Sequence, residues 1–228
     1  MRWNGKKKAL TFSYDDGVGQ DARLVEIFNR YGMKCTFNLN SGIQSGAHGH
    51  VRDDGVAIFR MNVAGLPELY RGHEIAVHAL THANLIHHDD AVVRNELTED
   101  IANLERIFGY KMMGMAYPYG TFDDRVVSLV EESGLQYART TISSHSFDMP
   151  SDLLRLPATC HHKDEKLMEL AREFLAADDE TPRLFYVWGH SYEFDINNNW
   201  DVIEEFCKLM AGHEDIFYGT NTEVLLGK

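Results

Sequence analysis

The chain has 228 residues, of which 44% are hydrophobic and 25% are charged, and its formal net charge is −13. This length and composition are typical of one folded domain with a full core and exclude a disordered chain. The negative charge excludes a nucleic acid as partner, because binding to a phosphate backbone depends on clustered Lys and Arg.

The N-terminus carries a small basic cluster of Arg2, Lys6, Lys7 and Lys8. Residues 9–14, which follow it, are typical of a short strand, and neither an apolar stretch of leader length nor a small-residue cleavage site is present. We therefore expect a cytoplasmic protein, or a secreted or periplasmic one if a leader has been removed. No stretch approaches ~18 apolar residues, so no membrane span is expected.

Short apolar runs alternate with segments of helical period along the chain, which is typical of βα units around a mainly parallel sheet or barrel. The expected strands are residues 9–13, 34–39, 74–77, 114–116, 137–140, 184–188 and 216–218. The expected helices are residues 21–31, 90–108, 123–133, 165–176 and 200–211. Asp123 and Gly134 are the predicted N-cap and C-terminal glycine of one of them. No repeat or linker divides the chain, so we expect a single domain over residues 1–228.

Residues 42–62 form a long connection with glycines and weak periodicity. Long loops in a compact domain are usually functional, so this one is a candidate rim for a cleft. The three cysteines, Cys35, Cys160 and Cys207, match neither a disulfide framework nor a CxxC clip, and we expect buried free thiols. The twelve histidines, several beside carboxylates, direct attention to metal chemistry instead.

Four segments place reactive side chains just after an expected strand. The first, T-F-S-Y-D-D-G at residues 11–17, ends in Asp15 and Asp16. In α/β barrels catalytic groups collect at the C-terminal ends of strands, although an Asp-Asp-Gly alone is also a common turn.

The second segment is G-H-E-I-A-V-H-A-L-T-H at residues 72–82. It brings His78 and His82 to the same side if one helical turn separates them, as metal ligation requires. His73 and Glu74 enter the strand, and we expect structural roles for them.

The third segment is A-Y-P-Y-G at residues 116–120, a strand end that turns at Pro118 and Gly120. Such a turn can direct a backbone N–H towards an oxyanion, or it can be an ordinary turn with two packed tyrosines. The fourth, L-F-Y-V-W-G-H-S-Y-E-F-D at residues 184–195, ends a strand at His190, a possible general acid or a core histidine.

In this order the four segments resemble the polysaccharide deacetylase family, the NodB-homology domain of carbohydrate esterase family four. The resemblance extends from Thr11 to His190 and includes C-T-F-N-L at residues 35–39 as the second strand. It implies an α/β fold, a distorted and incomplete (β/α) barrel of the NodB-homology type. It also implies removal of acetyl groups, N-acetyl groups above all, from an acetylated carbohydrate substrate.

Carried over by position, the resemblance implies one divalent metal ion held by Asp16, His78 and His82. Two imidazoles and a carboxylate suit Zn²⁺ first, and also Co²⁺, Ni²⁺ or Fe²⁺. The resemblance further implies that Asp15 is the general base and His190 the general acid. The backbone N–H of Tyr119 would then bind the oxyanion.

Two departures from the family pattern are visible. The third motif commonly begins with an arginine, and here Ala116 takes that place. Arg139, at the end of the next expected strand, could reach the same spot and tune Asp15. The fourth motif, D-x-x-D-W, is not recognisable, so the carboxylate that orients His190 is unassigned, with Asp148 as a candidate. Trp188 and Tyr117 are further candidates for substrate contact or tuning.

Two other functions stay open at this point. A similar barrel can hydrolyse non-sugar amides or cyclic imides with the same metal chemistry. A silent barrel can bind a glycan without cleaving it, although such proteins often lack the base, the acid or a ligand, all of which this sequence retains.

Overall fold

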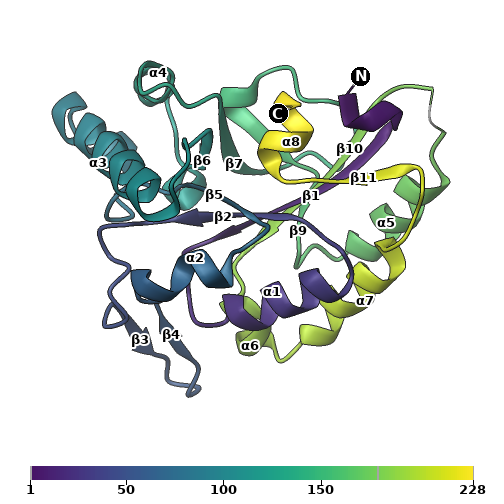
Figure 1. The fold of residues 1–228 in the computed structure, drawn as a ribbon, viewed down its shortest axis with the longest axis horizontal. Helices are drawn as coiled ribbons and strands as arrows, with labels where there is room; N and C mark the ends of the chain where they lie inside the picture. Colours follow the sequence, from purple (N-terminus) through teal and green to yellow (C-terminus); the bar gives the residue numbers. More distant parts are fainter. Residues whose placement is uncertain (1, 179, 228) are drawn as a thin grey trace.

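The computed structural model describes residues 2–178 and 180–227, and its centre is a curved parallel sheet flanked by helices (Figure 1). The strands follow the order β8-β7-β6-β5-β2-β1-β10-β9, and β11 pairs with the beginning of β1. Their bounds are β1 Lys8–Asp15, β2 Cys35–Leu39, β5 Glu74–Val77, β6 Gly114–Ala116, β7 Tyr137–Ser143, β8 Leu156–Ala158, β9 Cys160–His161, β10 Arg183–Gly189 and β11 Ile216–Tyr218. Among the described residues no ladder joins β8 to β9, so the expected incomplete barrel is confirmed.

The five expected helices are present with shifts of at most two residues at their ends. They are α1 Asp21–Arg30, α3 Asp90–Phe108, α4 Asp124–Glu132, α5 Leu167–Ala176 and α7 Trp200–Met210. The predicted cap of α4 is confirmed, since the Asp123 side chain accepts a hydrogen bond from Val126 N at 2.7 Å. Gly134, just after that helix, adopts a left-handed φ of +88° that favours glycine. Within residues 2–178 and 180–227, no helix has the length and apolar character of a membrane span.

The sequence did not predict several short elements. They are the antiparallel hairpin β3 Gly49–Val51 with β4 Ala57–Phe59, strands β8 and β9, helices α2 Leu66–Leu69, α6 Tyr192–Asn197 and α8 Asn221–Leu226, and the 3₁₀ turns η1 Arg2–Gly5, η2 Val63–Gly65, η3 Leu85–His87, η4 Pro118–Gly120 and η5 Leu153–Arg155. Elements of two to six residues are too short for apolar periodicity to stand out. In the hairpin, five of the six strand residues are exposed, so the alternation typical of a half-buried strand is missing.

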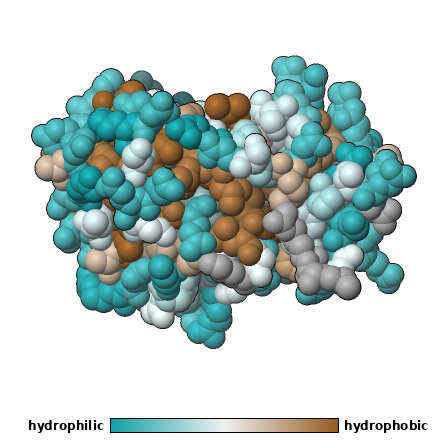
Figure 2. All heavy atoms as spheres, turned by 90° about the horizontal axis from the view of Figure 1, so that it is seen from above, coloured by the Kyte–Doolittle hydropathy of each residue, from teal (hydrophilic) through white to brown (hydrophobic). Residues whose placement is uncertain are grey.

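The side chains of β10 alternate between two apolar clusters. Phe185 and Val187 join the larger cluster under α1, α5 and α7, whereas Tyr186 and Trp188 join a smaller cluster with Trp3 and α8. Figure 1 shows α1, α5 and α7 along one side of the central strands and α8 on the other. Seen from above, the surface is mostly hydrophilic, and apolar atoms gather near the middle of the face (Figure 2). Cys35, Cys160 and Cys207 are buried free thiols, as expected.

Glu74, at the start of β5, fastens α8 to the sheet. Its carboxylate accepts hydrogen bonds from Thr36 Oγ1 and Tyr137 OH, both at 2.8 Å, and from the backbone N and hydroxyl of Thr222 in α8. The side chain is buried, so all four donors depend on this one carboxylate. The predicted structural role of Glu74 therefore has a physical basis.

We expect Glu74→Ala to lower the free energy of unfolding by about 3 kcal/mol, because it leaves buried donors without an acceptor. The control is Glu68→Ala, which removes an exposed carboxylate paired with Arg71 on the surface, and we expect a change below about 0.5 kcal/mol. Urea unfolding of both variants measures the difference. Equal small effects would show that Glu74 does not hold α8.

Candidate functional site

Because the central strands are parallel, the side chains that follow them meet at one edge of the sheet. Asp15 and Asp16 stand at the end of β1, His78 follows β5, and His190 follows β10. β1 lies between β2 and β10 in the sheet, so the aspartates are central and the histidines approach from both sides. The four residues come from segments up to 175 positions apart in the chain.

The backbone at Asp16 lets two consecutive side chains face one site. In a regular strand Asp15 and Asp16 would point to opposite faces. Asp16 instead has a φ of +90°, a conformation that an Asp side chain rarely adopts and that costs on the order of 1–3 kcal/mol. Its carbonyl accepts hydrogen bonds from Gln44 Nε2 at 2.9 Å and from Arg60 Nη1, which hold the turn in place.

Asp16, His78 and His82 form a group with metal-ligand geometry. Asp16 Oδ1 lies 3.7 Å from His78 Nε2 and 3.6 Å from His82 Nε2. Tetrahedral ligands at Zn²⁺ bond lengths are about 3.4 Å apart, so only small movements are needed to hold an ion. His82 reaches the group from a left-handed backbone with φ +60°.

The protonation of His78 suits a ligand. Its Nδ1 lies 2.7 Å from the carbonyl oxygen of Ala116, which can only accept, so Nδ1 carries the hydrogen and Nε2 presents its lone pair to the group. Burial lowers the pKa of His78 to about 4 and keeps the ring neutral. Burial also lowers the pKa of His82.

Asp16 Oδ1 is a buried acceptor without a hydrogen-bond partner among residues 2–178 and 180–227. Arg60 Nη1 lies 2.8 Å away and forms an ion pair, but its geometry is not that of a hydrogen bond. An unsatisfied carboxylate oxygen beside two neutral imidazoles is the donor set of a catalytic zinc site, which leaves one position open. The residues present therefore fit a divalent cation.

Asp15 is held by a buried arginine. Arg139 Nη2, from β7, donates to both Asp15 oxygens, at 2.6 Å for Oδ1, and Asn38 Nδ2 donates to Oδ1 at 2.8 Å. Burial disfavours the charged form, but Arg139, His78 and His190 together outweigh it, with Arg139 contributing most, and the pKa of Asp15 is lowered well below its usual range. The structure thus places Arg139 against the carboxylate that the family arginine would contact.

The three aromatic candidates differ in position. Trp188 lies under Arg139, with the guanidinium 4.4 Å from its ring centroid, so it supports the arginine by a cation–π contact. Tyr119 is 63% exposed and its ring lies edge-on to His82, 4.6 Å between centroids, at the rim of the site. Tyr117 is only 1% exposed and its hydroxyl donates to Leu154 O, so the expectation of substrate contact is wrong for this residue.

His190 follows β10 and is paired with Glu193, three residues later on α6. Its Nδ1 lies 3.4 Å from Glu193 Oε2, and its Nε2 lies 3.9 Å from Asp15 Oδ2. Burial lowers the pKa of His190, but Glu193 and the two aspartates outweigh burial and raise it. Glu193 is thus the carboxylate beside His190 Nδ1, whereas Asp148 accepts a hydrogen bond from Ser146.

Glu193 also contacts His161, whose Nε2 lies 3.0 Å from Glu193 Oε2. His161, His190 and Glu193 are close enough together to share a cation. Lys163 Nζ lies 3.0 Å from the other Glu193 oxygen, and Oε2 already faces His161 and His190. Asp16 also faces an arginine, but its Oδ1 has no hydrogen-bond partner in the described part of the chain, so the Asp16 group is the stronger candidate for a cation.

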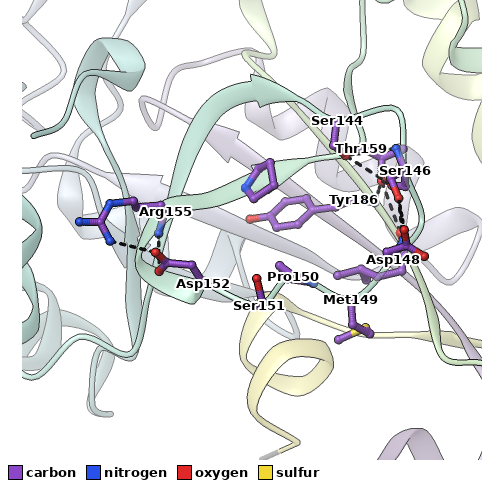
Figure 3. Close-up of a pocket in the computed structure, with 12 residues that line it drawn as sticks. Ser144, Ser146, Asp148, Met149, Pro150, Ser151, Asp152, Arg155, Thr159 and Tyr186 are labelled. Atoms are coloured by element: carbon purple, nitrogen blue, oxygen red, sulfur yellow. Dashed lines mark hydrogen bonds and ion pairs between the residues drawn. The ribbon is translucent and has the colours of Figure 1, made fainter. Parts of the chain in front are cut away.

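A cavity of about 280 Å³ lies apart from these residues, between the segment that follows β7 and the side chains of Leu184 and Tyr186. Figure 3 shows Asp148 hydrogen-bonded to Ser146 on one side of it and Asp152 paired with Arg155 on the other. None of Asp15, Asp16, His78, His82 and His190 lines it. Its carboxylates are engaged with their own loop, so this cavity does not belong to the candidate site.

Comparison with known proteins gives a consistent family and fold. Residues 3–138 match the family described as polysaccharide deacetylase. A Mycobacterium smegmatis protein assigned to the polysaccharide deacetylases has a TM-score of 0.69 and 20% identity, covering 98% of this chain and 90% of that one. No curated protein matches the chain.

Two further solved structures share the fold. A Streptococcus pyogenes deacetylase, solved in complex with acetate, has a TM-score of 0.55 and 18% identity and covers 64% of this chain. The match spans about three fifths (61%) of that protein's solved chain. A Bacillus anthracis pseudoenzyme of carbohydrate esterase family four has a TM-score of 0.58 and 17% identity, covering 96% of this chain and 66% of that one.

We expect Asp16→Asn, His78→Ala and His82→Ala to bind Zn²⁺ more than about tenfold more weakly than the unmodified protein, since each removes a ligand of the proposed group. Asp15→Asn should keep its metal, because Asp15 is bound to Arg139 and Asn38. Elemental analysis after dialysis against limiting Zn²⁺ measures the difference. Equal metal loss in all four variants would contradict the division of roles between the two aspartates.

Proposed function

Because this chain belongs to the polysaccharide deacetylase family, we propose that it is a metal-dependent hydrolase that removes acetyl groups, N-acetyl groups above all, from a carbohydrate. The observation that carries the proposal is the placement of Asp15 and His190, with Oδ2 and Nε2 3.9 Å apart, beside a group of three side chains that could hold a cation. These are the parts that acyl hydrolysis requires.

Asp16, His78 and His82 would hold a divalent cation, with Zn²⁺ as the first choice and Co²⁺, Ni²⁺ or Fe²⁺ as alternatives, and this cation would supply Lewis-acid activation of the water and of the acyl carbonyl. Asp15 accepts the proton of the attacking water, and Arg139 keeps it ionised for that step. The carbonyl carbon gains the new C–O bond, and its oxygen takes the negative charge.

The other residues act on the tetrahedral centre. The N–H groups of Gly120 and Thr121 bond within the η4 turn, to Tyr117 O and Pro118 O. We assign the adjacent Tyr119 N–H as the donor to the oxyanion, an interaction worth about 3 kcal/mol in comparable sites. His190 Nε2 delivers its proton to the departing amine nitrogen as the C–N bond breaks. The products are acetate and a free amino sugar.

Structural neighbours of this chain include a pseudoenzyme, so the fold alone does not decide between catalysis and binding. Here the base, the acid and all three ligand residues are present and gathered at one edge of the sheet. The pKa shifts of Asp15 and His190 also suit a base and an acid that act together, because the pKa of Asp15 is lowered and that of His190 is raised. These observations favour an active hydrolase.

The direct test is acetate release from N-acetylglucosamine oligomers and acetylated xylan by protein that has been stripped with chelator and reloaded with Zn²⁺ or Co²⁺. We expect release only after reloading, and none from Asp15→Asn with metal bound. Small cyclic imides serve as the comparison substrates. Turnover of those, with no acetate from any glycan, would replace the proposed substrate class with non-sugar amides.

The acid role of His190 predicts a pH effect of Glu193. His190 must carry its proton to act, so kcat/KM declines as pH rises through the His190 pKa. Because Glu193 raises that pKa, Glu193→Gln should move the decline to lower pH, and His190→Ala should lose about 100-fold or more in kcat. The control Glu205→Gln changes an exposed carboxylate of α7 and should leave the profile in place. An unmoved profile in Glu193→Gln would remove Glu193 from this role.

A further inference from the structure

The β3–β4 hairpin covers a second cavity, of about 320 Å³, that opens directly from the candidate site. Asp16 and Tyr192 are among the residues that line it, and the centroid of the Tyr192 ring lies 5.1 Å from that of His190. His48, His50, Arg52 and Arg60 line the rest, together with apolar side chains. In a protein with a net charge of −13, a cavity with two arginines and two histidines beside the reacting centre is a local concentration of basic groups.

The Arg60 guanidinium has N–H donors that meet no acceptor in the described part of the chain. Its three described contacts, to Asp16 O, Asp16 Oδ1 and Asn40 Oδ1, all use Nη1. Nε and Nη2, which form one edge of the guanidinium, have no acceptor in the described part of the chain, although the side chain is only 12% exposed. A planar edge with two parallel N–H groups matches a carboxylate in geometry and charge.

The backbone fixes Arg60 before any ligand arrives. Arg60 N donates to His48 O at 2.8 Å, and the residue forms a β-bridge with Val18, directly after the Asp-Asp-Gly turn. Gln20 Nε2 adds a hydrogen bond to Ala57 O at 2.7 Å, which fastens the hairpin to the start of α1. A donor that is already held in place loses little entropy on binding.

The charges in the cavity change when a cation is bound. The positive charge of Arg52 is neutralised by Asp54, which accepts hydrogen bonds from Arg52 Nε and Nη2, and the charge of Arg60 is neutralised by its ion pair with Asp16. A divalent cation on Asp16, His78 and His82 adds two positive charges to these two balanced pairs. The loaded site therefore attracts an anion, and Arg60 offers the free edge to bind it.

We propose that this cavity is an anion subsite in which Arg60 binds a carboxylate of the substrate, so that the substrate is an acylated sugar acid and not a neutral glycan. The proposal rests on the proposed function and specifies its substrate class. The carboxylate would lie within one sugar unit of the acyl group, since the cavity begins at Asp16.

N-acetylmuramic acid and its methyl ester form a matched probe pair, because they share the acetamido sugar and the ester replaces the charged carboxylate with a neutral group one methyl larger. Calorimetry with Zn²⁺-loaded Asp15→Asn protein measures binding without turnover. We expect the acid to bind about tenfold or more tightly than the ester, on the scale of a charge-assisted bidentate contact. In the active protein, kcat/KM for acetate release should favour the acid in the same direction.

Arg60→Gln should abolish this preference, and Arg60→Lys, which keeps the charge but not the planar edge, should retain part of it. The control is Arg71→Gln, an exposed arginine that pairs with Glu68 outside the cavity, and we expect a change below about threefold. Elemental analysis verifies that each variant still holds Zn²⁺.

Equal binding of acid and ester overturns the subsite, whatever the variants do. A preference that survives in Arg60→Gln with metal bound overturns the assignment to Arg60. Arg60-dependent binding of the acid without acetate release from any sugar keeps the subsite and removes the deacetylase activity. Acetate release from acid and ester at equal kcat/KM keeps the deacetylase and removes the subsite.

Discussion

Two adjacent carboxylates, buried at the end of one strand, are the constraint on which this site depends. An isolated buried charge costs several kcal/mol, so each aspartate requires opposing charge or hydrogen bonds. Asp15 receives Arg139 from β7, and Asp16 receives Arg60 from the segment after the β3–β4 hairpin. The left-handed backbone at Asp16 lets both side chains face the same site, where each meets its own arginine. Under the proposed function, one aspartate serves as base and the other as ligand.

Much of the fold can be predicted from the local sequence, and so can part of the candidate site. The long helices and the central strands are visible as apolar periodicity, and the parallel arrangement then brings Asp15, His78 and His190 to one edge. Arg139 is also within reach of sequence reasoning, because it lies on the next strand, β7, in register with Ala116 at the end of β6. These residues are predictable because a strand end fixes where its side chain lies.

The site residues that the sequence does not predict, Glu193 and Arg60, lie on segments whose positions depend on contacts with distant parts of the chain. Glu193 is three residues from His190, but that spacing has meaning only once α6 begins at Tyr192, and a six-residue helix shows no clear period. Arg60 reaches Asp16 because its backbone pairs with Val18, 42 positions earlier in the chain. No short motif encodes such a bridge. The loop of residues 42–62 was nevertheless recognisable as the rim of a cleft, and Arg60 lies at its end.

The two departures from the family pattern have a common explanation in electrostatics. A base at this position requires a buried positive charge beside it, and a guanidinium on β7 can supply that charge as well as one on β6. What the acid needs is a carboxylate on its Nδ1 side, and Glu193 meets that need from the helix that follows His190 itself. The outcome is a pair of groups with opposite pKa shifts, Asp15 lowered by Arg139 and His190 raised by Glu193 and the aspartates. Between those two pKa values the base is ionised while the acid is protonated, which is the state that a single turnover needs from both. Under the proposed function, Arg139 and Glu193 would therefore give the base and the acid the same electrostatic environment as the family's own residues.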